Sequence, residues 1–464
     1  MLYNSFQFIF EFLPACLVLY FVAGRISRGL SNAVLGLMSL VFYAWWDWRN
    51  LPILLASIVF NYAMGRRLRA HPSKPLLVTG VMVNLVLLAF FKYINFAIWN
   101  IAALTGGKVS PVHIVLPLGI SFFTFTQIAF LVDAWRGEAN ELNFSRYGLF
   151  VTFFPHLIAG PIVHHRELMP QFAGRKAGRW NGLNVNLGLA FFILGLFKKV
   201  AIADGLAPWA NEVFGASSQL GFGHSWSGAL AYTLQLYFDF SGYSDMAIGL
   251  GLLFNIRLPD NFDAPYRAGN ISEFWRRWHM TLSRFLRDYL YIPLGGNRLG
   301  EPRRRVNLMV TMLLGGLWHG AGWTFVIWGG YHGVLLVLHH LWNNWRPPLS
   351  AFVARPITFL AVVVGWVFFR AENMAKARSL LGSMAGVHGS GSTLPHGALQ
   401  TRLVVLGLLL LFVNFAPTTK QWVEERTLNM WRAIILGTLL FFALLCMRNA
   451  LMTNRPSEFL YFQF

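Results

Sequence analysis

Long runs of apolar residues recur along the whole sequence and are separated by short polar segments. A helix that crosses a lipid bilayer needs roughly 20 mainly apolar residues. The runs that approach this length lie at residues 6–24, 31–46, 51–65, 76–99, 114–132, 184–203, 226–254, 306–322, 324–342, 354–369, 402–416 and 431–447. About eleven crossings with short connections would use up the chain. The pattern therefore predicts an all-α polytopic integral membrane protein with one transmembrane domain over residues 1–464.

The apolar segment 147–163 is shorter than the others and contains Pro155, Gly160 and Pro161. Non-helical backbone at membrane depth is tolerated only where it is buried in protein or lines a water-filled cavity. We therefore expect a re-entrant segment, with Pro155 and His156 in the wall of a cavity. A kinked helix that crosses the membrane is the alternative.

Charge supports the membrane interpretation. Only 12% of the residues are charged, whereas soluble domains carry about 25%. The net charge of +19 would suggest nucleic acid as a partner in a soluble protein. Here the basic residues lie between apolar runs, so we expect them in cytoplasmic loops next to anionic headgroups, with no nucleic-acid partner. The two cysteines, Cys16 and Cys446, lie in apolar segments and predict neither a disulfide framework nor a thiolate metal site.

The distribution of Lys and Arg predicts the orientation, because cytoplasmic loops are enriched in both. Arg25 and Arg28 follow the first run, which places the N-terminus outside, and the basic loop at 66–74 lies inside. The segment 204–225 has no Lys or Arg and is expected to be an outer loop. Because no basic residue precedes Arg25, the first run is typical of an uncleaved helix, not of a removable signal peptide.

Residues 257–305 differ from the rest of the chain and are expected to be cytoplasmic. This segment contains ten arginines: Arg257, Arg267, Arg276, Arg277, Arg284, Arg287, Arg298, Arg303, Arg304 and Arg305. Within it, residues 271–291 combine arginines with aromatic residues, as interfacial amphipathic helices do. Ser272 is a plausible N-cap for that helix.

Ionisable side chains at membrane depth are costly, so each one is a hypothesis about function. His319 follows an apolar run and is surrounded by Gly315, Gly316, Gly320 and Gly322. These glycines could let helices approach closely or let a substrate reach the ring. A neutral imidazole could act there as a general base, whereas a histidine that only links helices by hydrogen bonds is the structural alternative.

Other candidate residues are less distinctive. His279 lies on the predicted interfacial helix, where a histidine is common. Asp239 and Asp245 lie in an apolar run, six residues apart, and do not share a helical face. One of them could pair with an arginine of 257–305, or both could belong to a structural polar network. His332 lies thirteen residues after His319, a spacing that fits no metal pair on a helix, and no metal or nucleotide motif is present, so neither kind of cofactor is predicted.

Several of these segments together resemble the membrane-bound O-acyltransferase (MBOAT) family, and its bacterial branch with the alginate O-acetylation protein AlgI and the D-alanyl transfer protein DltB. The blocks that carry the resemblance occur in one order over most of the chain: SLVFYAWW (39–46), FFKYINF (90–96), LPLGISF (116–122), FPHLIAGP (154–161), YFDFSGYSDMAIGLG (237–251), FWRRWH (274–279) and LWHG (317–320).

The resemblance implies a ring of about eleven transmembrane helices, with re-entrant and interfacial helices, around a central tunnel in the bacterial inner membrane. His319 matches the catalytic histidine of the family and His279 matches a second histidine near the acyl path. The substrate path would also include Trp318, Asp239, Asp245, Arg276, Arg277, Trp278, Pro155 and His156.

The implied reaction is the transfer of an acyl group, most simply acetyl from acetyl-CoA or from an acyl carrier, toward a polysaccharide hydroxyl outside the cell. Alginate or a similar exopolysaccharide would be the acceptor, and an extracytoplasmic partner acyltransferase would complete the transfer. The alternatives are D-alanyl transfer to teichoic acid and a transporter of acyl donor or saccharide, since transporters also need broken helices and buried ionisable residues. A polysaccharide synthase fits less well, because no loop is long enough for a glycosyltransferase domain.

Overall fold

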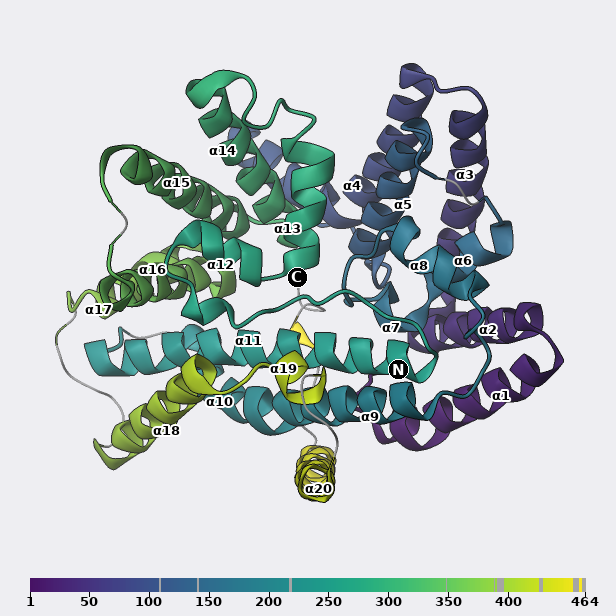
Figure 1. Cartoon of the computed structure of the whole chain (residues 1–464). Helices are drawn as coiled ribbons and strands as arrows, with labels where there is room; N and C mark the ends of the chain where they lie inside the picture. The colour runs from purple at the N-terminus through teal and green to yellow at the C-terminus, as the bar shows by residue number, and fades with distance from the viewer. Residues whose placement is uncertain are drawn as a thin grey trace. The chain divides into compact units, whose positions relative to one another are not determined.

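The computed structural model describes residues 1–107, 110–139, 142–216, 219–347, 349–387, 389, 396–424, 429–453 and 459–460. Within these ranges the chain is helical or irregular and contains no β-strand (Figure 1). The predicted all-α class is therefore confirmed.

The chain divides into two compact units, each built from three segments that are not consecutive in the sequence. Unit 1 consists of Met1–Leu196, Tyr243–Asp260 and Trp431–Gly437, and unit 2 consists of Phe197–Gly242, Asn261–Met430 and Thr438–Phe464. The long helix α11 (Phe222–Leu253) begins in unit 2 and ends in unit 1. The single transmembrane domain expected over 1–464 stays a prediction.

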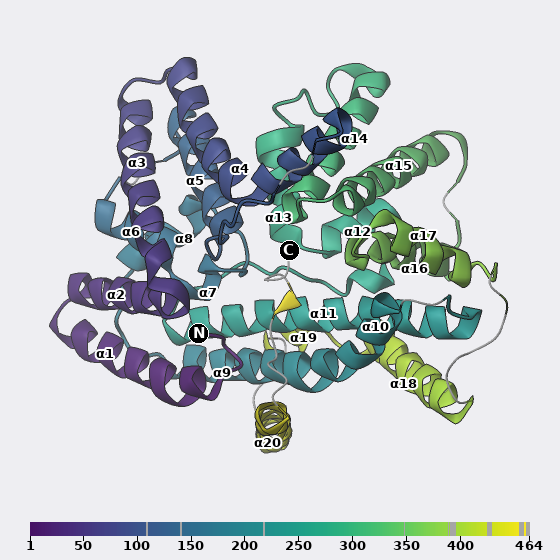
Figure 2. The ribbon, with the colours of Figure 1, turned by 180° about the vertical axis from the view of Figure 1, so that it is seen from behind.

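Unit 1 contains the N-terminal helices. They are η1 (Phe8–Phe12), α1 (Leu13–Ile26), α2 (Arg28–Asp47), η2 (Trp48–Asn50), α3 (Leu51–Ala70), α4 (Lys74–Thr105), α5 (Ile120–Trp135), α6 (Phe144–Thr152), α7 (Phe154–Leu157), α8 (His165–Ala173) and α9 (Gly182–Phe197). Helices α1 and α2 form an antiparallel hairpin (Figures 1 and 2). Ser27 separates them because its extended backbone ends α1, while its hydroxyl accepts a hydrogen bond from the Leu30 amide at 3.1 Å and caps α2.

Buried amides hold α3, α4 and α5 together. The Asn61 and Asn84 side chains exchange two hydrogen bonds of 2.7 and 3.1 Å, and the Gln127 amide donates to the Ser57 hydroxyl at 2.9 Å. In a membrane protein such polar pairs link helices that are otherwise apolar.

The segment 147–163 is broken, as expected. Helix α6 ends at Thr152, Phe153 leaves the helical conformation (φ −51°, ψ 106°), and α7 lasts only four residues before an irregular stretch that leads to α8. Every residue from 151 to 165 is buried, so the irregular backbone lies inside protein, where it is tolerated. That this segment is re-entrant stays a prediction.

Unit 2 contains most of the remaining helices. They are η3 (Lys198–Ala203), α10 (Asp204–Gly215), the first part of α11, η4 (Pro265–Arg267), α12 (Ile271–Arg277), α13 (Met280–Leu286), η5 (Arg287–Tyr291), α14 (Gly300–His319), α15 (Trp323–Trp345), α16 (Ala351–Arg370), α17 (Met374–Met384), α18 (His396–Phe415), α19 (Thr419–Glu424) and α20 (Met430–Met452) except for its residues Trp431–Gly437, which belong to unit 1. Helices α14 and α15 form a hairpin whose helices approach closely because glycines lie at the contact positions. A methyl group on Gly316 would lie 2.3 Å from the Phe325 carbonyl oxygen, and one on Gly329 would lie 2.3 Å from that of Met312.

Three local predictions need correction. The predicted helix 271–291 is broken at Trp278 and His279 into α12, α13 and η5. Its N-cap is Asn270 and not Ser272, because the Asn270 side chain accepts a hydrogen bond from the Glu273 amide at 2.8 Å. The loop expected at 204–225 is helical over Asp204–Gly215, where Leu206, Ala210 and Val213 form a buried face.

Seven helical stretches within the described ranges are long and apolar enough to cross a bilayer: Phe8–Ile26, Arg28–Ala70, Lys74–Thr105, Gly182–Gly215, Ala351–Arg370, Gly397–Phe415 and Met430–Met452. Arg28–Ala70 contains two of the runs that the sequence predicted separately. The number of about eleven crossings, and their arrangement as a ring around a tunnel, stay predictions.

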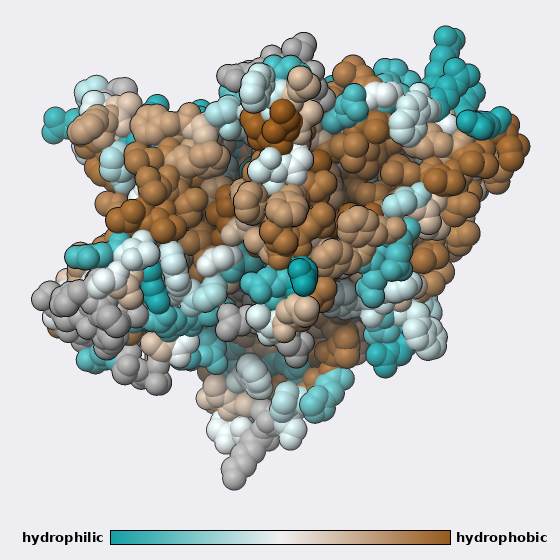
Figure 3. Space-filling view, turned by 90° about the horizontal axis from the view of Figure 1, so that it is seen from below, coloured by the Kyte–Doolittle hydropathy of each residue, from teal (hydrophilic) through white to brown (hydrophobic). Residues whose placement is uncertain are grey.

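Large apolar side chains are exposed on the outside of these helices. On α4 they are Val78, Met82, Val83, Leu85, Val86 and Phe90. Figure 3 shows apolar residues, in brown, over broad areas of one face of the molecule. Soluble monomers rarely expose contiguous apolar surface on this scale, so these helix faces are suited to contact with lipid.

Candidate active site

His319 is the last residue of α14, which ends there because the backbone at Gly320 is extended (φ −160°, ψ 150°). The side chain is buried, with 5% of its surface exposed. Three aromatic rings surround the imidazole: Trp318 at 4.9 Å, Trp328 at 5.1 Å and Phe369 at 5.2 Å between ring centroids. The imidazole therefore lies in an aromatic box built from α14, α15 and α16.

Two of the four glycines near His319 lie at close packing contacts. Gly316 lies against the backbone of α15, and a methyl group on Gly320 would lie 2.1 Å from the Phe325 ring. Of the two interpretations of these glycines, close approach of helices therefore holds for Gly316 and Gly320.

His279 lies at the break between α12 and α13 in a left-handed backbone conformation (φ +43°, ψ 54°). Such a conformation is costly for a residue with a Cβ and concentrates at functional sites. Nδ1 of His279 lies 3.0 Å from Oδ1 of Asn261, which also accepts hydrogen bonds from the amide and the hydroxyl of Thr281 at 3.3 and 2.9 Å. Because this oxygen can only accept, Nδ1 carries the proton and Nε2 carries the lone pair.

Burial determines the protonation of His279. The side chain is completely buried, and this burial lowers the pKa of His279 to about 3, since a low-dielectric environment disfavours the imidazolium. The ring is therefore neutral at physiological pH.

Trp318 connects the two histidines. Its ring centroid lies 4.9 Å from that of His319 and 6.4 Å from that of His279. His279 and His319 thus share one aromatic neighbour, Trp318, within unit 2.

Asp239 pairs with a lysine and not with an arginine of 257–305, whereas for Asp245 such a pair stays a prediction. The Asp239 carboxylate lies 2.8 Å from the Lys199 ammonium, which also contacts Asp204 at 2.6 Å. Asp239 and Lys199 are 1% and 2% exposed. The second carboxylate oxygen of Asp239 accepts a hydrogen bond from the Leu460 amide at 3.1 Å, so the buried charges also hold the C-terminal segment.

That C-terminal segment packs near His279. The Phe459 ring lies 5.7 Å from Phe240, and Phe240 lies 4.7 Å from the His279 imidazole in an edge-on arrangement. Phe240 thus contacts both the tail and the histidine.

The other predicted path residues of the first half of the chain lie in unit 1. Pro155 and His156 are buried in α7, and the imidazole of His156 is hydrogen bonded through Nε2 to the Phe150 carbonyl at 2.7 Å. Asp245 is half-buried on the part of α11 that belongs to unit 1, whereas Asp239 lies on the part in unit 2. The two carboxylates thus belong to different units.

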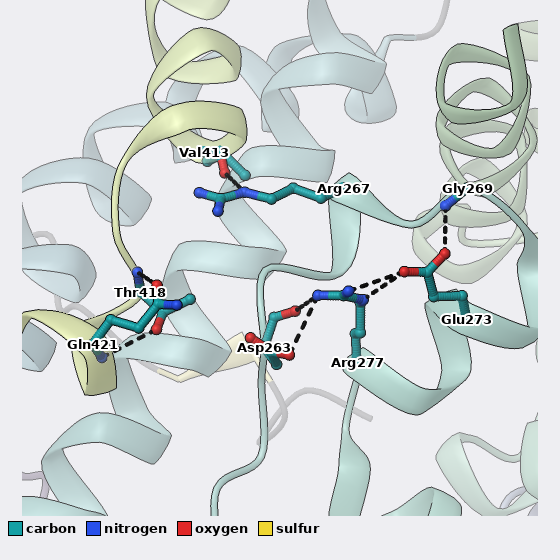
Figure 4. A network of polar contacts seen from close by, with 8 residues as sticks. All are labelled: Asp263, Arg267, Gly269, Glu273, Arg277, Val413, Thr418 and Gln421. Carbon is teal, nitrogen blue, oxygen red and sulfur yellow. Dashed lines mark hydrogen bonds and ion pairs between the residues drawn. The ribbon is translucent and has the colours of Figure 1, made fainter. Parts of the chain in front are cut away.

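The arginines of 257–305 divide into two groups. Arg277 forms ion pairs with Glu273 at 3.0 Å and Asp263 at 3.3 Å, and Arg267 donates to the Val413 carbonyl (Figure 4). Arg267 also donates to the Ala416 carbonyl. These two stabilise the fold of the segment. Arg276, in contrast, is exposed, whereas Trp278 is buried among aromatic rings, with Trp366 at 4.8 Å.

Four residues at the site were not predicted from the sequence. Asn261, Trp328, Phe369 and Lys199 contact His279, His319 or Asp239 from positions 9 to 50 residues away. Trp328 and Phe369 lie in apolar runs, where an aromatic residue does not indicate a functional role. Lys199 could have been recognised, because a lysine at the end of a predicted membrane span is a candidate for an ion pair.

Among the described residues, no group of three or more His, Cys, Asp or Glu side chains is arranged to hold a metal ion.

Comparison with known proteins adds an independent line of evidence. The model of the MBOAT, membrane-bound O-acyltransferase family, matches residues 42–371, a range that includes both histidines. The chain is 45% identical to the peptidoglycan O-acetyltransferase of Helicobacter pylori, over 84% of this chain and 80% of that protein. It is 40% identical to the probable alginate O-acetylase AlgI of Pseudomonas putida over the full length of both. It is 28% identical to the teichoic acid D-alanyltransferase of Bacillus subtilis, over 56% of this chain and 68% of that protein.

Proposed function

The chain belongs to the membrane-bound O-acyltransferase family, and from this we propose that it transfers acetyl groups from a cytoplasmic thioester to hydroxyl groups of an extracytoplasmic polysaccharide. The observation that carries this proposal is the sequence identity of 40 to 45% to proteins named for the O-acetylation of peptidoglycan and alginate. The sequence identity to the relative named for D-alanyl transfer is 28%, over about half of the chain. This difference favours acetyl over D-alanyl transfer.

His319 acts as the general base in this proposal. It removes the proton from the attacking hydroxyl, whose oxygen then bonds to the carbonyl carbon of the thioester. The carbon–sulfur bond breaks, and the thiolate takes up the proton from the imidazolium. The aromatic box around His319 supports this role because it excludes water, which would otherwise hydrolyse the donor.

His279 has a different role. Burial lowers the pKa of His279 to about 3, so its ring is neutral. With Nδ1–H held by Asn261, His279 instead presents the Nε2 lone pair as a hydrogen-bond acceptor. We assign it the orientation of the acceptor hydroxyl or of a bound water.

The donor is acetyl-CoA or an acetylated carrier. Exposed cations of 257–305, Arg276 among them, would attract its phosphate groups, while Arg277 and Trp278 shape the segment beneath. Asp239 acts through the fold, because its ion pair with Lys199 holds α11 and the C-terminal residues.

The protein acts in the inner membrane of a bacterium, with its N-terminus outside and the 257–305 segment in the cytoplasm. An extracytoplasmic partner acyltransferase receives the acetyl group and passes it to the polymer.

The first experiment uses purified protein in lipid nanodiscs with acetyl-CoA labelled on the acetyl group, and compares wild type with His319→Ala. We expect label to move from CoA to the polysaccharide or to the partner with the wild type. In the variant the rate falls by at least about 100-fold, because a general base contributes typically 10²–10⁴-fold.

Two controls separate the alternatives. His113→Ala changes a histidine that lies outside α14 and α15 and leaves transfer intact. Label that crosses the membrane still attached to CoA would identify a transporter, and turnover only with a D-alanyl carrier protein would replace acetyl by D-alanyl. Undiminished transfer by a folded His319→Ala protein would rule out the assigned base.

A further inference from the structure

The aromatic box around His319 is closed on one side by two rings from different helices. Trp328 of α15 stands perpendicular to the imidazole at 5.1 Å, and Phe369 of α16 lies at 5.2 Å. The two rings also contact each other at 5.1 Å, and they are 1% and 2% exposed. Together they form a continuous apolar wall next to the proposed base.

A second layer of rings, buried except for the half-buried Phe325, supports this wall. Trp328 packs against Trp366 at 5.8 Å and His332 at 5.0 Å, and Phe369 packs against Phe325 at 5.1 Å. His332 is completely buried, and neither of its ring nitrogens has a hydrogen-bond partner within the described part of the chain. Because protein interiors are close-packed, Trp328 and Phe369 cannot move aside without displacing this layer.

Close packing next to a reacting carbonyl limits the size of the acyl group. The carbonyl carbon must lie near His319 for the hydroxyl to attack it, and our proposal places the alkyl part of the acyl group against this wall. A methyl group needs little space, whereas every further methylene must push Trp328 or Phe369 into the second layer, and overpacking of this kind is costly.

We infer that Trp328 and Phe369 determine specificity by restricting the acyl group to acetyl. This inference rests on the proposed function, which supplies the thioester donor and His319 as the base. The reaction with a longer donor has the same balance: one carbon–sulfur bond breaks, one carbon–oxygen bond forms, and one proton passes from the hydroxyl to the released thiol.

The experiment measures acyl transfer in permeabilised cells of a deletion strain that carries the gene on a plasmid, so that the acceptor and any partner are present. Acetyl-, propionyl- and butyryl-CoA, each labelled on the acyl group, are compared for wild type, Trp328→Ala and Phe369→Ala. Wild type should prefer acetyl over propionyl by about tenfold or more, the usual effect of one methylene in a closed pocket. Either substitution should raise the ratio of butyryl to acetyl transfer by about tenfold or more.

Trp226→Ala is the matched control. It removes the same kind of side chain from α11, where the Trp226 indole donates to the Met384 carbonyl at 3.0 Å and its ring packs against Phe222. The wild-type preference for acetyl should persist in this variant. If it shifted as in Trp328→Ala, a general loosening of the core would explain the result and the specific role would be lost.

The remaining outcomes are also decisive. Equal transfer of acetyl and butyryl by the wild type overturns the inference. If the two Ala variants fail to fold, Trp328→Phe and Phe369→Leu replace them as smaller changes to the same rings. Folded Ala variants with an unchanged donor profile overturn the inference as well. Transfer from none of the three CoA thioesters would contradict acetyl-CoA as the donor in the proposed function and, with it, this inference.

Discussion

Both His279 and His319 contact the Trp318 ring, but their other neighbours differ. His319 has aromatic rings on three sides, whereas His279 has an amide oxygen that fixes its tautomer. Two identical side chains can therefore perform different tasks, because the environment sets which nitrogen holds the proton and at what pH. The left-handed backbone at His279 fits this division, since strain is retained where geometry matters for function.

The stability of the protein should depend on pH through His279. Its pKa is lowered to about 3 in the folded state, against about 6.5 in an unfolded chain. Between these values the unfolded chain binds more protons, so the free energy of unfolding falls as the pH is lowered, by up to about 1.4 kcal/mol per pH unit. Melting temperatures in detergent between pH 7.5 and 4.5 should therefore fall less steeply for His279→Gln than for wild type.

The exposed His71 provides the control for this measurement. His71→Gln should keep the wild-type slope, because an exposed imidazole is solvated in both states. Parallel curves for wild type and His279→Gln would show that His279 is not a buried neutral group.

The protein should be more stable with the Lys199–Asp239 ion pair intact, or with both residues replaced by apolar ones, than with only one of them replaced. Lys199→Met leaves the buried Asp239 carboxylate without its cation, and breaking a buried pair in this way costs about 3–5 kcal/mol. Lys199→Met combined with Asp239→Leu should recover most of this loss, because Asp204 is partly exposed and can be solvated. Size-exclusion profiles and melting temperatures in detergent test this, and a double variant no more stable than the single one would contradict it.

At the scale of the elements, the α14–α15 hairpin determines where His319 lies. The two helices approach closely because Gly316 and Gly329 leave room for each other's backbone, as small residues do between membrane helices. Trp328 precedes Gly329, so the same close approach brings the Trp328 ring to His319. Packing and site geometry are thus parts of one arrangement.

A methyl group at this contact should damage both stability and activity. Gly329→Ala places Cβ 2.3 Å from the Met312 carbonyl oxygen, a backbone atom that cannot rotate away. We expect a loss of about 1–3 kcal/mol from overpacking, a melting temperature several degrees lower and reduced acyl transfer. Gly330→Ala is the control on the adjacent residue, because its Cβ would lie 3.4 Å from a flexible leucine side chain. Equal melting temperatures for the two variants would show that the helices are not in close contact at Gly329.

For the whole molecule, the sequence predicted the helices that a membrane requires. It did not predict the features that depend on contacts between residues far apart in the sequence. Apolar runs indicate helices reliably because backbone in lipid must satisfy its own hydrogen bonds. The break at His279 depends on Asn261, and the partner of Asp239 is Lys199, so neither could be inferred from local pattern. His319 could be identified because it lies in a motif of the family, whereas Trp328 and Phe369 became visible only when α15 and α16 were in place.

Orientation is the remaining prediction, and it concerns the chain as a whole. Arginines follow the first helix and fill the 66–74 loop, while 204–225 has none, so the positive-inside rule places His71 in the cytoplasm and Gln219 outside. Both side chains are exposed. In a protein with Cys446→Ala and the buried Cys16 retained, Gln219→Cys should react with a membrane-impermeant maleimide in intact cells. His71→Cys should react only after permeabilisation. The reverse pattern would invert the protein and place the arginines of 257–305 outside the cell, where no cytoplasmic thioester could reach them; the donor assignment would then fail together with the orientation.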